Sequence, residues 1–242
     1  MRAVKALLLV LLVSVLGLLA WMARPIEPVI AGPAPSRVYS ADQLTVRAAL
    51  VVGSNWDGTA EVFDPDSYEI IARYNLVPDL EARFAEINDS WRRRIEVRFI
   101  RHVVGEGNDQ LVDDLFPSAD GRYLYVSRPS LADAIALNVL SGEIAWRTPV
   151  EGARADHAAL SPDGKTFLIS ASSAGKVHAI DTATGKIIGG FEPGDQPHES
   201  NYSKDGHRIY HATIGKVFVP TTARWLDSVS YTHLTLPTTP YV

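Results

Sequence analysis

The chain has 242 residues, 46% of them hydrophobic and 21% charged, a globular composition that excludes a collagen-like or wholly disordered chain. Its 23 basic and 28 acidic residues give a net charge of -5, which argues against a general nucleic-acid binder. Because there is no cysteine, the chain cannot form a disulfide, a thiolate zinc site, an iron–sulfur cluster or a cysteine nucleophile.

The N-terminus carries an export pattern. Arg2 and Lys5 precede an uncharged apolar run over residues 6–22, the order found in secretory signal peptides and membrane anchors. The run is about 17 residues long, near the lower limit for crossing a bilayer, and Trp21 suits the membrane interface. We therefore expect residues 1–24 to be a signal peptide or a membrane anchor, cleaved or retained. The rest of the chain is then extracytoplasmic, in the periplasm or at the cell surface.

The next segment, residues 25–37, is rich in proline and predicts a stiff, extended linker. The folded domain is expected to follow it, over residues 38–228.

The C-terminal residues form a separate case. Val229 to Thr238 reads Val-Ser-Tyr-Thr-His-Leu-Thr-Leu-Pro-Thr, which resembles the translation of a transposon-based sequencing adapter. Residues 229–242 are therefore expected to be an artefactual or disordered tail, with a different natural sequence after about Ser228.

The middle of the chain repeats itself. Ser-x-Asp-Gly begins at residues 118, 161 and 203, so the steps are 43 and 42 residues. Each copy continues with an apolar run, and the first two add a second run and a Ser-Gly or Thr-Gly pair. An earlier copy, from Val46 to Ile71, keeps only the second half of the pattern.

Each repeat predicts a short antiparallel meander of about four strands. Asp-Gly supplies the positive φ angle of a tight turn, and the runs between turns are rich in β-branched and aromatic residues. One meander cannot bury its own faces, so neighbouring repeats must stack, and a period of about 40–45 residues is typical of a β-propeller blade. The sequence predicts an all-β fold: an incomplete β-propeller of about 3–4 four-stranded blades.

The string Ser161-Pro-Asp-Gly followed by Val177-His-Ala-Ile-Asp and Thr184-Gly-Lys resembles the YVTN-type β-propeller repeat family, and the likeness spans roughly residues 40–225. Gly142-Glu-Ile-Ala-Trp146 is also similar to the tryptophan-bearing repeat of quinoprotein propellers. Ser67-Tyr68 and Arg224-Trp225 depart from the pattern where Thr-Gly is expected. The resemblance implies a binding scaffold or, in its quinoprotein form, a PQQ enzyme.

About 30 extra residues, 78–110, separate the first two copies. Apolar residues at helical spacing predict one inserted helix over 78–95, with Asp79 as its cap and Arg92–Arg94 near its end. The alternation from Ile95 to Phe99 predicts a strand after it. The arginines between 92 and 101 form either a solvated basic face or a site for an anion.

Candidate ligand-binding residues lie where each repeat enters its innermost strand, at the mouth of the propeller channel. Counting back from each Ser-x-Asp-Gly turn gives Asp114, His157, and the pair His198 and Glu199. Imidazoles and carboxylates could hold a divalent ion or act as acid and base, and they also line wet channels for structural reasons alone. No catalytic residue is assigned, and no metal is specified.

We expect an exported, membrane-tethered propeller that binds a small molecule or an envelope protein at the channel face, with residues 6–22 in the membrane, no nucleic-acid partner and no cofactor. The alternative is an extracytoplasmic enzyme, either PQQ-dependent and dehydrogenase-like or a metal-dependent, lactonase-like hydrolase. A purely structural envelope module remains a third possibility.

Overall fold

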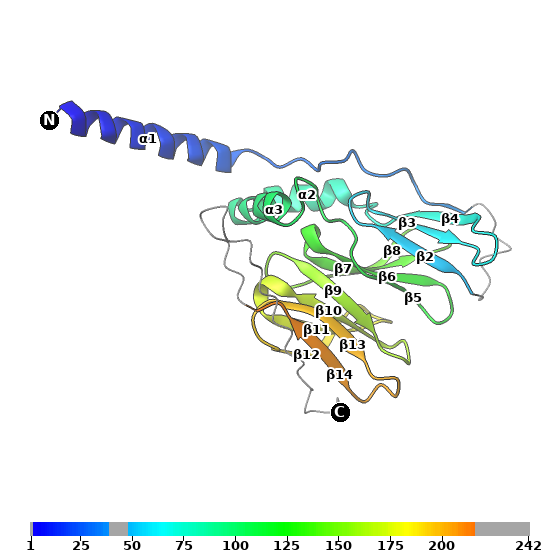
Figure 1. The fold of residues 1–242 in the computed structure, drawn as a ribbon. Helices are drawn as coiled ribbons and strands as arrows, with labels where there is room; N and C mark the ends of the chain where they lie inside the picture. The colour runs from blue at the N-terminus through cyan, green and yellow to red at the C-terminus, as the bar shows by residue number, and fades with distance from the viewer. Residues whose placement is uncertain (1, 39–47, 216–242) are drawn as a thin grey trace.

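The computed structural model describes residues 2–38 and 48–215, with side chains from residue 9 onward. Helix α1 (Arg2–Ala23) precedes a stack of antiparallel sheets, and two helices, α2 (Leu80–Asn88) and α3 (Trp91–Val103), lie between α1 and the sheets (Figure 1). The predicted tail, 229–242, and the departure at Arg224-Trp225 lie outside the described residues.

The described residues form three four-stranded sheets and one two-stranded sheet. Blade 1 has the strand order β1-β4-β3-β2: β1 (Arg37–Val38), β2 (Leu50–Ser54), β3 (Thr59–Phe63) and β4 (Ile70–Asn75). Blade 2 contains β5 (Leu115–Pro117), β6 (Tyr123–Arg128), β7 (Asp133–Asn138) and β8 (Ile144–Pro149). Blade 3 contains β9 (Ala155–Leu160), β10 (Thr166–Ala171), β11 (Lys176–Asp181) and β12 (Ile187–Phe191), and blade 4 contains β13 (Pro197–Tyr202) and β14 (Ile209–Thr213).

The Ser-x-Asp-Gly turns join the first two strands of blades 2, 3 and 4 with the same hydrogen bonds. In blade 2, Ser118 Oγ donates to Asp120 at 2.7 Å and accepts from the Tyr123 amide at 2.9 Å. The other two turns repeat both bonds: Ser161 with Asp163 and Thr166, and Ser203 with Asp205 and Arg208. The Ser and Asp side chains therefore specify the turn through hydrogen bonds made within the turn itself. This explains why Ser-x-Asp-Gly recurs in the sequence.

These corners lie next to one another in successive blades. A Cβ added at Gly164 would lie 4.0 Å from Ala119 of the preceding turn, and one at Gly206 would lie 3.7 Å from Pro162. The three turns thus follow one another on one side of the molecule, and the predicted incomplete β-propeller is confirmed.

Apolar side chains fill the space between blades. Between blades 1 and 2 the core includes Ile71, Tyr74 and Val126, and between blades 2 and 3 it includes Tyr125 and Phe167. Trp146 of β8 packs against blade 3, where its indole N–H donates to the Thr182 carbonyl at 2.9 Å. Because no blade can bury both faces alone, this stacking supplies most of the apolar burial.

Blade 1 differs from the others. Its Asp64 turn, with Tyr68 at φ 58°, matches the turns at Asn138 and Asp181 that join the third and fourth strands of blades 2 and 3. Strands β2 to β4 are therefore equivalent to the second, third and fourth strands of those blades. Residues 39–47, which precede β2, lie outside the described residues. Strand β1 pairs with the outer edge of β4.

The insertion contains two helices, so the prediction of one helix followed by a strand is wrong. Ser90 begins α3, and its side chain accepts from the Arg93 amide. Val97 and Ile100, three residues apart, are buried, whereas Phe99 is 54% exposed. The residues whose alternation predicted a strand therefore lie on a helix, and the capping serine fixes where this helix begins. Asp79 makes no side-chain cap; its carboxylate binds Arg128 at 2.6 Å.

The proline-rich segment does not run free of the fold. Ile26 is buried, and both its amide and its carbonyl bond to the Asn88 side chain, at 2.8 and 2.9 Å. The Arg98 guanidinium donates to the Arg24 carbonyl, and Val29 donates to Asp109 at 2.9 Å. Arg94, Arg98 and Arg101 thus hold the N-terminal segment, whereas Arg92 remains exposed and pairs with Glu96.

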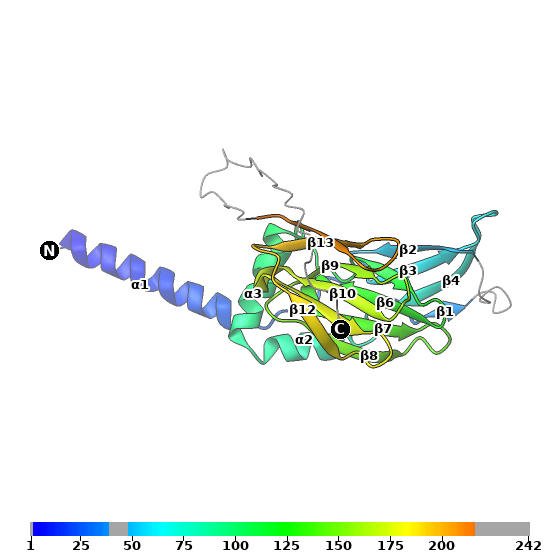
Figure 2. The same ribbon diagram turned by 90° about the horizontal axis from the view of Figure 1, so that it is seen from below.

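Figure 2 shows α1 extending away from the sheets. Within the described part of the chain, no helix combines the length and the apolar character that a membrane span requires.

Candidate functional site

The innermost strands of blades 2, 3 and 4 each carry a β-bulge at the same place. In blade 2 the amide of Asp113 bonds to the Ser127 carbonyl, and the Ser127 amide bonds to the Asp114 carbonyl. In blade 3 the register shift leaves Asp156 and His157 opposite Ser170. In blade 4 it leaves His198 and Glu199 opposite Ala212. Two consecutive residues facing one partner is the definition of a bulge, which redirects side chains that would otherwise alternate.

The bulges gather two sets of side chains, one from each bulge position. The second positions hold Asp114, His157 and Glu199. His157 Nδ1 lies 3.2 Å from Asp114 Oδ2 and 3.4 Å from Glu199 Oε2, so this imidazole lies between carboxylates of the two neighbouring blades.

The first positions hold Asp113, Asp156 and His198. His198 Nδ1 lies 3.4 Å from Asp156 Oδ2, and His157 Nδ1 lies 3.9 Å from Asp113 Oδ2. The rings of His157 and His198 meet edge to face with centroids 4.1 Å apart. The two sets therefore form one continuous cluster, the acid–histidine cluster, made of Asp113, Asp114, Asp156, His157, His198 and Glu199.

Negative charge dominates this cluster. The hydrogen bond to Asp114 raises the pKa of His157 to about 9, while burial raises the pKa of Asp113 to about 6. Burial and the nearby Asp114 charge also raise the pKa of Glu199. Burial opposes ionisation of Asp156, but the His198 hydrogen bond and the Arg154 charge lower its pKa overall.

Two carboxylate oxygens in the cluster have no hydrogen-bond partner. They are Asp113 Oδ2 and Asp156 Oδ1, both buried, and the Asp156 side chain is fully buried. Asp156 uses its other oxygen for Arg154, 2.5 Å away. Because unpartnered buried oxygens are rare and costly, they mark a place where a donor or a cation fits.

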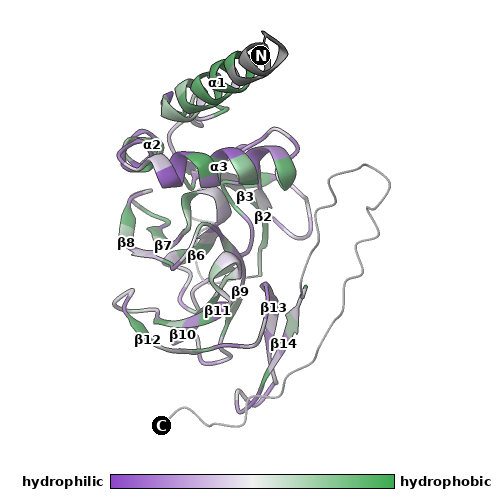
Figure 3. Cartoon of the chain, turned by 90° about the vertical axis from the view of Figure 1, so that its left-hand side faces the viewer, coloured by the Kyte–Doolittle hydropathy of each residue, from purple (hydrophilic) through white to green (hydrophobic). Residues whose placement is uncertain are grey.

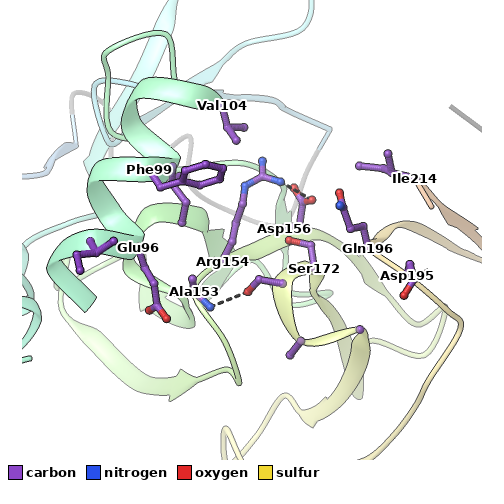
Figure 4. Close-up of a pocket in the computed structure, with 15 residues that line it drawn as sticks. Glu96, Phe99, Val104, Ala153, Arg154, Asp156, Ser172, Asp195, Gln196 and Ile214 are labelled. Atoms are coloured by element: carbon purple, nitrogen blue, oxygen red, sulfur yellow. Dashed lines mark hydrogen bonds and ion pairs between the residues drawn. The ribbon is translucent and has the colours of Figure 1, made fainter. Parts of the chain in front are cut away.

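A groove of about 920 Å³ lies between α3 and the loops of blades 3 and 4 (Figure 4). Its lining is mainly apolar: Ile95, Phe99, Ile100, Val104, Ala153, Ala174 and Ile214. Arg154 and Asp156 also line it, so the groove opens onto the acid–histidine cluster. Figure 3 shows α3, which forms one wall of the groove, on the α1 side of the sheets.

The structure thus brings together all four predicted site residues, Asp114, His157, His198 and Glu199. Sequence reasoning did not select Asp113, Asp156 or Arg154, although Asp113, Asp156 and His198 keep the repeat spacing. Strict alternation along a strand would place Asp113, Asp156 and His198 on the face opposite to their neighbours in the cluster. Only the bulges bring them into the cluster. The wall formed by α3 was also missed, because the sequence predicted a strand there.

No protein-family model and no curated protein matches the sequence. Among solved structures, a chain of the "Crystal Structure of Mitotic Checkpoint Complex" is similar, with a TM-score of 0.49 and 15% sequence identity. The match covers 69% of this chain and 43% of that chain, so this chain spans less than half of its length. The assignment of the fold rests on the blades themselves.

Proposed function

We propose that this chain is a β-propeller, exported by means of residues 6–22, that binds a segment of another protein in the groove beside α3. The groove carries this proposal. Its volume of about 920 Å³ and apolar lining are typical of sites that bury most of a ligand. Phe99 is 54% exposed in its wall, which suits an apolar anchor of the partner.

The charged side chains that line the groove favour a partner segment with a basic residue. Three carboxylates, those of Glu96, Asp156 and Asp195, line the groove with one arginine, Arg154. A segment with apolar residues followed by a lysine or arginine complements this lining. Figure 4 shows Phe99 and Val104 on one side of Arg154 and Asp195 on the other.

The test uses a displayed library of random peptides selected on the full chain. Enriched peptides should carry apolar and basic residues, and Phe99→Asp should weaken their binding at least about tenfold. Leu140→Asp is the matched control, because Leu140 is 72% exposed and does not line the groove. Failure to enrich any peptide, or equal binding by both variants, would refute the proposal.

Export is tested separately with an alkaline phosphatase reporter joined after residue 38. Activity that disappears when residues 6–22 are deleted supports export. An inactive fusion of normal abundance contradicts it.

A second candidate is a metal-dependent, lactonase-like hydrolase, favoured by the position of His157 between two carboxylates. An imidazole in that setting can exchange a proton with a bound substrate. Hydrolysis of simple lactones by the full chain, lost in His157→Ala, would establish this candidate. No comparable observation favours the PQQ enzyme, since Trp146, its main motivation, packs between blades 2 and 3.

A further inference from the structure

Three side chains of the acid–histidine cluster are placed as metal ligands would be. Asp156, His157 and His198 each offer one donor atom, and these atoms lie within 4.8 Å of one another. Two imidazole nitrogens and one carboxylate oxygen are a common donor set for Zn²⁺ and related divalent ions.

One of the two histidines, His157, is held through a ring nitrogen by a carboxylate outside the set, that of Asp114. His157 Nδ1 faces Asp114 Oδ2 at 3.2 Å, and His198 Nδ1 faces Asp156 Oδ2 at 3.4 Å. For His157 this leaves Nε2 for a ligand, whereas His198 Nδ1 lies 3.4 Å from the Asp156 carboxylate, a spacing at which both groups can bind the same ion. Metal-binding histidines in proteins usually have such a carboxylate partner, which fixes the tautomer and the ring orientation.

Asp156 supplies an independent observation. Its side chain is fully buried, yet Oδ1 has no hydrogen-bond partner, while Oδ2 is engaged by Arg154 and His198. Desolvation of a carboxylate oxygen without a partner costs free energy, and a bound cation would offset that cost.

The charge balance points the same way. Four carboxylates, those of Asp113, Asp114, Asp156 and Glu199, face one guanidinium and two imidazoles within a partly buried cluster. Even with one imidazole protonated, negative charge remains in excess, and a divalent cation would balance it.

We propose that Asp156, His157 and His198 bind one divalent transition-metal ion of the Zn²⁺ class where the bulges of β9 and β13 meet. A second set, Asp113, Asp114 and His157, shares His157 and contains a single imidazole. The first set is preferred because it has two imidazoles and a fully buried carboxylate.

The experiment titrates Co²⁺, as a spectroscopic substitute for Zn²⁺, into the chelator-treated full chain. We expect a visible d–d absorption band that saturates at one ion per chain and is displaced by Zn²⁺. Asp156→Asn and His198→Gln should each weaken binding at least about tenfold. His207→Gln, in an exposed turn, is the matched control and should bind like the unchanged chain.

A thermal melt in the same samples separates lost binding from lost folding. Zn²⁺ should raise the melting temperature of the unchanged chain and of the His207 variant, and leave that of the folded Asp156 and His198 variants unchanged. Absence of a cobalt band and of Zn²⁺ stabilisation in the unchanged chain overturns the proposal. Equal metal binding by folded Asp156→Asn and His198→Gln also overturns it. Neither result bears on peptide binding in the groove, which Phe99→Asp tests.

Discussion

Arg128 and Asp133 form a double hydrogen bond, at 2.7 and 2.9 Å, with both side chains fully buried. The two residues are directly opposite each other on β6 and β7. The other side of the guanidinium binds Asp79, at the start of α2. One buried arginine therefore connects blade 2 to the start of α2, the first of the two inserted helices.

Arg128→Met should destabilise the protein by about 3–5 kcal/mol, because it leaves the Asp133 carboxylate buried without its main counter-charge. Urea unfolding, followed by circular dichroism, measures this loss. Arg92→Met is the control: Arg92 is 78% exposed and pairs with Glu96, so its loss should cost less than about 1 kcal/mol. Replacing Arg128 by Met and Asp133 by Leu together should cost less than Arg128→Met alone. A single-variant loss below that of the control would contradict this account.

Gly185 and Gly121 provide a matched pair for the packing between blades. Both have positive φ, 70° and 69°, so alanine is strained by about 1–2 kcal/mol at either position. At Gly185 the added Cβ would also lie 2.7 Å from the Trp146 ring, whereas Gly121 has no atom within 4 Å. Gly185→Ala should therefore be more destabilising by about 1–3 kcal/mol in the same urea experiment. Equal losses would show that Trp146 moves aside freely.

The blades could be predicted from the sequence because their turns are specified locally. Ser118 and Asp120 bond within five residues of chain, and the same pattern recurs in two further copies. Local chemistry of this kind is visible in a single sequence, and stacking follows from the unburied faces.

The bulges and the second inserted helix could not be predicted in the same way. Alternation is the only side-chain rule that a strand sequence offers, and it places Asp156 and His157 on opposite faces. The apolar residues between Ile95 and Phe99 fit both periods, and the choice of helix depends on Ser90 and on burial of Val97 by distant residues. The groove is lined by α3 and by Asp156 of the β9 bulge, so it could not be predicted from the sequence.

His211 gives a pH prediction away from the cluster. It is 1% exposed on β14, bonds Ser200 Oγ at 2.8 Å and packs against Phe191. Burial, with a contribution from His198, lowers the pKa of His211 to about 4, whereas an unfolded histidine has a pKa of about 6.5. Between pH 4 and pH 6.5 the unfolded chain is therefore protonated at this histidine, whereas the folded chain is not.

Above pH 6.5 the neutral, buried His211 does not lower the free energy of unfolding. As the pH falls from 6.5 towards 4, the free energy of unfolding decreases, because the unfolded chain takes up the proton first. His211→Gln should reduce the loss of unfolding free energy between pH 7 and pH 4.5 by about 2 kcal/mol, at 1.36 kcal/mol per pKa unit. Urea unfolding at both pH values measures it. His207→Gln, exposed in a turn, should leave the pH dependence unchanged. If the two variants behaved alike, burial of His211 would not control acid sensitivity.

Asn88 is expected to determine how firmly the N-terminal segment is attached. Its amide bonds the backbone of Ile26 in both directions, at 2.8 and 2.9 Å, and no other side chain among the described residues makes that pair of bonds. Asn88→Ala removes both bonds, so the Ile26 amide should open without global unfolding. Hydrogen exchange in residues 24–31 should accelerate at least about tenfold, while exchange in β10 and β11 stays constant. Glu81→Ala, exposed on the same helix, is the control. Unchanged exchange in 24–31 would mean that the Arg98 and Asp109 contacts suffice, and the segment would then be fixed by α3 and the loop after it rather than by α2.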